Sequence, residues 1–128
     1  MKKHVTSLEL SKKLKELGVK QESEFYWIKR PAPFGDEWFL EPYYDTQTKE
    51  RKNGCSAFLS SELGEMLPSE IEINELSGWI TINRGIRDVW TVGYRKNGGH
   101  SCFHLTEGET EVNARAKMLI YLIENNLI

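Results

Sequence analysis

The chain has 128 residues, 39% of them hydrophobic and 28% charged, a composition typical of a globular domain. Its formal net charge of −2 argues against a partner bound mainly through phosphates, because such binding usually requires a surplus of Lys and Arg. No apolar run approaches the ~20 residues of a membrane span, and no apolar stretch follows the basic N-terminus as in a signal peptide. We therefore expect a single cytoplasmic domain, residues 1–128, without membrane contact and with both cysteines reduced.

The first predicted element is a helix over residues 7–17. Thr6 and Glu9 match the two ends of a capping box, which places the N-cap at Thr6. Leucines recur at helical spacing behind it, and Gly18 stands where a left-handed C-terminal cap belongs.

Two aromatic-rich strand pairs follow, each with tryptophans 11 residues apart. The word RKNG occurs twice, and Asn-Gly is a strong hairpin signal, so both copies predict a turn before a third strand. Each third strand leads into a helix. The predicted strands are 24–30, 38–43, 55–59, 78–84, 89–95 and 99–105, and the two further helices are 60–67 and 110–126.

The predicted fold class is therefore α+β, in the order α-βββ-α-βββ-α. Short sequential connections favour a mainly antiparallel sheet with the helices on one face. The matched tryptophans and RKNG words are consistent with an internal βββα duplication, although a chance resemblance between two hairpins is favoured because hairpins of any origin reuse Asn-Gly.

A possible metal site is the stretch GGHSCFH at 98–104, where His100, Cys102 and His104 alternate along a strand and would share one face of a sheet. Cys55 is the only other cysteine that could complete a zinc site. Neither a CxxC nor an HxxxH pair occurs, so ordinary strand alternation is the favoured interpretation and no metal or cofactor is expected. Nucleophilic catalysis by Cys102 lacks an orienting third group, and no catalytic residue is assigned.

An enzymatic alternative is a metal-dependent hydrolase or nuclease. Asp36 is followed at a distance by Glu50-Arg51-Lys52, an acid-x-Lys pattern found in metal-dependent nucleases. Here the pattern runs directly into the predicted turn at Asn53-Gly54, which weakens the match.

A third hypothesis is single-stranded nucleic-acid binding by exposed aromatic side chains. Basic residues near the ends of the second strand pair could follow a phosphate backbone, and they are Arg84, Arg87, Arg95 and Lys96. The acidic balance of the chain opposes this hypothesis.

The leading hypothesis is a non-enzymatic module that binds a protein or nucleic acid through the open face of the sheet. Alternation along the strand places Ile80 and Ile82 on the inner face, so Trp79 and Thr81 lie on the outer face. The candidate binding residues on or beside that face are Trp79, Thr81, Arg84, His100 and His104. An unpaired edge strand would also allow a homodimer.

Three words in the chain point to a family: ELSKKLKELGVKQESEFYW at 9–27, ELGEMLP at 62–68 and EVNARAKMLIYLIENNLI at 111–128. In this order they resemble a group of small phage- and prophage-encoded proteins of unassigned function. The resemblance implies a mobile-element origin and a bacterial cytoplasm. It carries no site residues over to this chain, and it is compatible with an accessory protein that binds a macromolecule.

Overall fold

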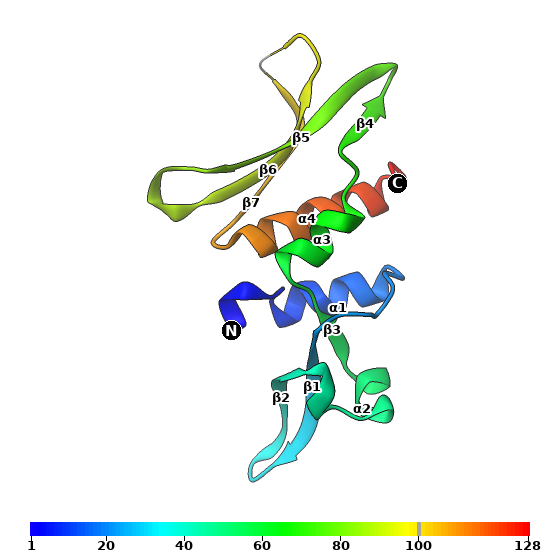
Figure 1. The fold of residues 1–128 in the computed structure, drawn as a ribbon, viewed down its shortest axis with the longest axis vertical. Coiled ribbons are helices and arrows are strands. Elements are labelled where there is room, and N and C mark those ends of the chain that lie inside the picture. Colours follow the sequence, from blue (N-terminus) through cyan, green and yellow to red (C-terminus); the bar gives the residue numbers. More distant parts are fainter. Residues whose placement is uncertain (100) are drawn as a thin grey trace. The chain divides into compact units, whose positions relative to one another are not determined.

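The computed structural model describes residues 1–99 and 101–128 and divides the chain into two compact units, Met1–Leu59 and Ser60–Ile128 (Figure 1). The predicted α+β class with antiparallel strand pairing is confirmed, although the strands form two sheets, one in each unit. The expected single domain stays a prediction.

The first unit contains a three-stranded antiparallel sheet in the order β2-β1-β3. Its elements are a 3₁₀ turn Lys2–His4, α1 (Leu8–Glu16), β1 (Phe25–Ala32), β2 (Gly35–Pro42), a 3₁₀ turn Tyr43–Asp45, α2 (Thr48–Asn53) and β3 (Cys55–Ala57). Pro42, which has no N–H to donate, ends β2 at the edge of this sheet.

The cap of α1 differs from the prediction by one residue. Ser7 is the N-cap, and its hydroxyl accepts a hydrogen bond from the Leu10 N–H. Thr6 is fully buried instead, with its hydroxyl 2.6 Å from that of Ser11 and accepting a hydrogen bond from the Phe58 N–H. The predicted cap at Thr6 is therefore wrong, because this hydroxyl joins the helix to the strand region.

The first RKNG word does not form a turn between strands. Residues 51–53 are the last residues of α2, a helix that the sequence analysis missed, and Gly54 is its C-cap. Lys15 of α1 reinforces this end, because its ammonium donates to the carbonyls of Lys52 and Gly54 at 2.8 and 2.6 Å. Only the second word, at 95–98, leads from the end of a strand into a β-hairpin connection.

The second unit contains a four-stranded antiparallel sheet in the sequential order β4-β5-β6-β7. Its elements are α3 (Ser60–Met66), β4 (Glu70–Ile73), β5 (Leu76–Arg84), a 3₁₀ turn Ile86–Asp88, β6 (Trp90–Lys96), β7 (Cys102–Gly108) and α4 (Glu111–Glu124). Strand β4 was not predicted, and at four residues it is short for a periodicity signal.

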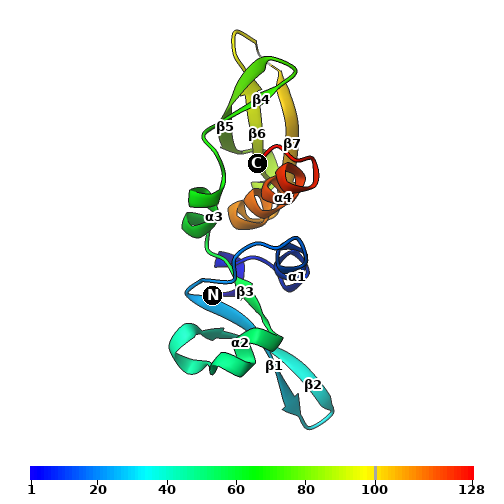
Figure 2. The same cartoon turned by 90° about the vertical axis from the view of Figure 1, so that its right-hand side faces the viewer.

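Helix α4 covers one face of this sheet, lying along β6 and β7, while α3 packs on α4 (Figures 1 and 2). Val92 and Tyr94 of β6 and Thr106 of β7 are buried on this side, and the Thr106 hydroxyl donates to the Ala114 carbonyl of α4 at 2.8 Å. In the part of the unit that the structure describes, no helix packs on the opposite face of the sheet.

The two tryptophan pairs do not occupy equivalent positions. Trp27 pairs with Leu40, two residues beyond Trp38, whereas Trp79 pairs with Arg95, five residues beyond Trp90. The equal spacing therefore does not reflect an equal register. Neither feature that suggested an internal duplication places matching residues at matching points of the two sheets.

Candidate functional site

A β-bulge in β7 determines which side chains share a face of the second sheet. Gly93 pairs with Leu105 and Arg95 with Cys102, so Phe103 and His104 together stand opposite the single residue Tyr94. Such an extra residue reverses the alternation of side chains along the bulged strand. The predicted common face for Cys102 and His104 is therefore wrong, because Cys102 pairs with Arg95 on one face of the sheet and the bulge turns His104 to the other.

His104 lies on the helix-covered face. Its imidazole stacks on the Tyr121 ring of α4, with ring centroids 3.7 Å apart and an interplanar angle of 7°. The expectation that His104 faces away from the helices is thus contradicted. Its role in this structure is to pack β7 on α4.

Arg84 also lies off the open face. It is directly paired with Trp90, one residue out of phase with Trp79 and Thr81, and its guanidinium lies 5.9 Å from the centre of the Trp90 ring. A 2.5 Å ion pair joins it to Asp88 in the loop between β5 and β6. The geometry supports a role for Arg84 in shaping that loop.

Of the other predicted binding residues, two lie on the open face and one lies outside the described part of the chain. Trp79 and Thr81 lie on the open face, as expected from the inward position of Ile80. His100 lies outside the described residues, so its place in the site stays a prediction.

Cross-strand pairs define the open face row by row. One row contains Glu70, Trp79, Arg95 and Cys102, and the next contains Thr81, Gly93 and Leu105. Trp79 has 64% of its surface exposed and Leu105 has 55%, although both belong to strands. This face therefore presents two large apolar side chains to its surroundings.

Gly93 explains how Leu105 reaches across the sheet. A Cβ atom at this position would lie 2.5 Å from Leu105 Cδ2, 3.0 Å from the His104 carbonyl oxygen and 3.4 Å from Cys102 Sγ. Without a side chain at Gly93, the Leu105 side chain occupies the space above this residue of β6. Sequence analysis missed Leu105 and Gly93, because their proximity depends on the register of β6 and β7.

The two cysteines belong to different units and have different surroundings. Cys55 is buried in the first unit, and burial raises the pKa of its thiol to about 11. Cys102 is partly exposed on the second sheet. Among residues 1–99 and 101–128, no group of three or more His, Cys, Asp or Glu side chains is arranged to hold a metal ion.

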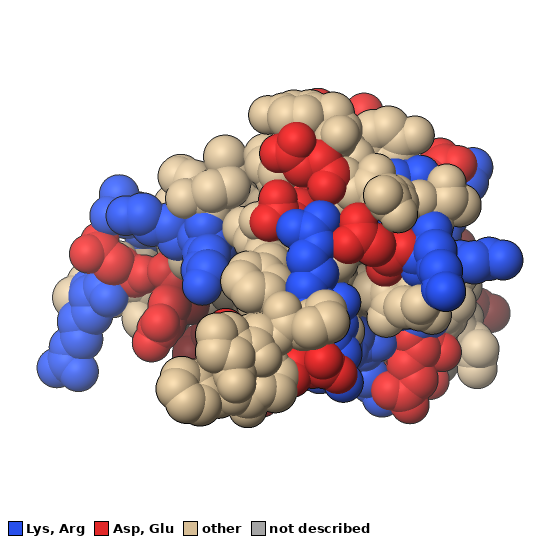
Figure 3. All heavy atoms as spheres, turned by 90° about the horizontal axis from the view of Figure 1, so that it is seen from below, with Lys and Arg blue, Asp and Glu red and all other residues tan. Residues whose placement is uncertain are grey.

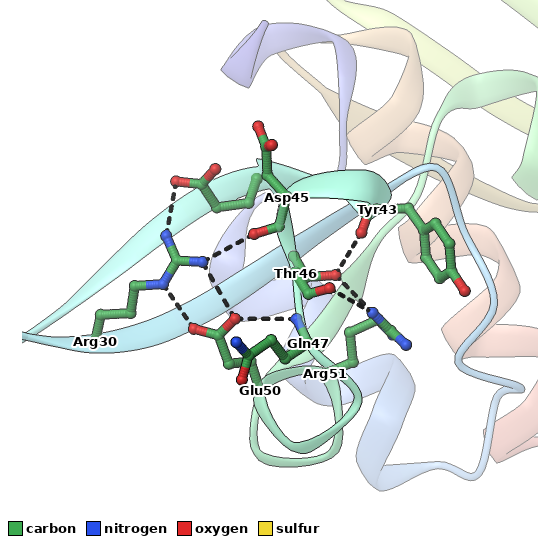
Figure 4. Close-up of polar contacts among 8 residues, drawn as sticks. Arg30, Tyr43, Asp45, Thr46, Gln47, Glu50 and Arg51 are labelled. Carbon is green, nitrogen blue, oxygen red and sulfur yellow. Dashed lines mark hydrogen bonds and ion pairs between the residues drawn. The ribbon is translucent and has the colours of Figure 1, made fainter.

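Glu50, the acid of the nuclease-like pattern, is already engaged. Arg30 of β1 contacts both of its carboxylate oxygens, at 2.7 and 3.2 Å, and the Gln47 N–H donates to one of them at 3.0 Å (Figure 4). The hydrogen bond from Arg30 lowers the pKa of Glu50. This carboxylate fastens α2 to the first sheet, which argues against its use as a metal ligand.

A second arginine in Figure 4 is also held within the first unit. The Arg51 guanidinium donates to the carbonyl and hydroxyl of Thr46 and lies 4.4 Å from the centre of the Tyr43 ring. On the face shown in Figure 3, Lys and Arg side chains are interspersed with Asp and Glu. That face does not carry the continuous basic surface that phosphate binding favours.

No described helix is both long enough and apolar enough to cross a membrane. Compared with protein-family models, curated proteins and solved structures, the chain matches none.

Proposed function

We propose that this chain is a non-enzymatic binding module that holds a macromolecular partner against the open face of β5, β6 and β7. The observation that carries the proposal is Trp79, which is mostly exposed in the middle of a sheet and on the face opposite α4. A large indole left in water forfeits the free energy that its burial would contribute, and a partner would recover it.

The surroundings of Trp79 fit a binding surface. Tryptophan and arginine are enriched among the residues that dominate binding energies, and Arg95 is directly paired with Trp79. The sheet is held from behind by α4, so the side chains of the open face are positioned before a partner arrives. Prior ordering of this kind lowers the entropic cost of association.

The word resemblance extends the proposal to the biological setting. We propose a phage- or prophage-encoded accessory protein that acts in the cytoplasm of a bacterial host. This part rests on the three sequence words alone.

The test compares Trp79→Ala with Phe34→Ala. Phe34 is 98% exposed at the tip of the β1–β2 hairpin, so its removal is a matched loss of an exposed aromatic side chain elsewhere. Wild-type and Phe34→Ala proteins should retain the same partner from a bacterial lysate, and Trp79→Ala should lose it while melting at nearly the wild-type temperature. Equal retention by all three proteins, or a large drop in the melting temperature of Trp79→Ala, would count against the proposal.

A further inference from the structure

The open face of the second sheet has a charge pattern that restricts its occupant. Glu70 pairs with Trp79, Glu72 with Ser77 and Glu107 with Thr91, and these pairings place all three exposed carboxylates on this face. Arg95 is the one cationic side chain that the pairings of β4–β7 put beside them, over the described residues. The face is therefore acidic around an apolar centre formed by Trp79 and Leu105.

We infer that the occupant is a protein segment that combines apolar and cationic side chains. This inference rests on the proposed function and specifies its partner. Apolar groups of the segment would cover Trp79 and Leu105, and Lys or Arg side chains would meet the carboxylates at the rim. This division into an apolar centre and a polar rim is common in protein interfaces.

Charge complementarity disfavours the two other classes of occupant. A second copy of the chain would bring one acidic face against another, and nucleic acid would bring phosphates against the same carboxylates. Arg95 offsets only part of this, because the pairings set one positive charge against three carboxylates. A cationic segment is opposed by neither effect.

The experiment selects ligands from a displayed library of random linear peptides and measures their affinities for four purified proteins. These are the wild type, Trp79→Ala, the triple variant Glu70→Gln/Glu72→Gln/Glu107→Gln, and the control Glu16→Gln/Glu37→Gln/Glu65→Gln. The control removes the same charge from exposed positions that lie outside β4–β7.

We expect the selected peptides to be rich in apolar residues, Lys and Arg. Trp79→Ala should weaken their binding about tenfold or more, as for a central tryptophan of an interface. The open-face triple variant should weaken it about threefold to tenfold in a salt-dependent manner, and the control triple variant should bind like the wild type.

Each other outcome has a distinct meaning. Acidic peptides that depend on Trp79 would overturn the inference and leave the proposed function standing, whereas peptides indifferent to Trp79→Ala, or no enriched peptide, would overturn both. Labelled single-stranded oligonucleotides and sedimentation of the free protein complete the test. Trp79-dependent binding of the oligonucleotides, or a Trp79-dependent dimer, would replace the inferred peptide partner.

Discussion

The two sheets of this protein differ in how many of their faces are covered. In the first unit, Lys12 of α1 lies 4.7 Å from the centre of the Trp38 ring on one face, and α2 binds Arg30 through Glu50 on the other. In the second unit, α4 covers one face, and the described part of the unit provides no helix for the other. The part of the first sheet around Trp27 and Ile28 is thus buried between layers, whereas the second sheet keeps one face open.

The consequence is clearest for two tryptophans that look alike in the sequence. Each stands in the first strand of a hairpin and precedes a second tryptophan by 11 residues. Trp27 is 7% exposed and donates a hydrogen bond from its indole to the Thr6 carbonyl, whereas Trp79 is 64% exposed. The covering of the sheet, and not the local sequence, determines whether the side chain stabilises the fold or is available to a partner.

The largest expected effect comes from removing the buried tryptophan. Trp27→Ala deletes a side chain packed with Val5, Cys55 and Ala57, and should lower the free energy of unfolding by about 3–5 kcal/mol. Trp79→Ala should lower it by less than about 1 kcal/mol, as is usual for an exposed position. Urea denaturation followed by circular dichroism measures both free energies. Similar decreases in the two variants would contradict the predicted difference between Trp27 and Trp79.

An intermediate effect is expected at alkaline pH. Burial raises the pKa of Cys55 to about 11 and that of Tyr94 to about 12, whereas the pKa in the unfolded chain is about 8.5 for a thiol and about 10 for a phenol. Below its unfolded pKa each group is protonated in both the folded and the unfolded chain, so its contribution to folding stability is fully present there. As the pH rises from about 8.5 to 12, the unfolded chain releases protons that the folded chain retains, and stability falls.

Titration of Cys55 and of Tyr94 should each lower the free energy of unfolding by no more than about 1.4 kcal/mol per pH unit, between the unfolded and folded pKa of the group. Cys55→Ala should flatten the decline between about pH 8.5 and 11, and Tyr94→Phe between about pH 10 and 12. Tyr94→Phe also loses the 2.6 Å hydrogen bond that this hydroxyl donates to the Pro68 carbonyl, so its stability should be lower at neutral pH. An unchanged alkaline decline in both variants would show that other groups cause it.

The smallest expected effect is at acidic pH and concerns the first sheet. Because the pKa of Glu50 is lowered by Arg30, the interaction contributes fully above the carboxyl's unfolded pKa and is lost as the pH falls through its folded value. Glu50→Gln should reduce stability slightly at pH 7 and make it less sensitive to acid below about pH 4.3. Thermal melting across this range checks the prediction, and an acid dependence equal to that of the wild type would contradict it.

Local sequence signals predicted much of the fold, and failed where a distant contact decides the outcome. The alternation of Ile80 and Ile82 correctly placed Trp79 and Thr81 outside. The Asn53-Gly54 pair suits a hairpin turn or a helix end, and here Lys15 and Arg30, both distant in the sequence, stabilise the helix α2. No property of residues 51–54 alone distinguishes the two structures.

The candidate site was less predictable than the fold, for a similar reason. The bulge at Phe103 and His104 exists only in the pairing of β7 with β6, so alternation within β7 could not reveal it. Once the bulge is present, Leu105 moves to the open face and His104 to the helix face. The extra residue therefore separates His104 from Cys102, which weakens the metal hypothesis. It also replaces His104 by Leu105 among the residues of the open face.

The most direct test of the account follows the reactivity of Cys102, whose sulfur lies beside Gly93 and Leu105 on the open face. Cys55 serves as an internal control, because a buried thiol with a raised pKa should not react in the folded protein. We predict that a maleimide labels Cys102 of the free protein and that a saturating selected peptide slows this labelling about tenfold. Labelling of Cys102 at the same rate with and without the bound peptide would show that the partner lies elsewhere and would contradict the account.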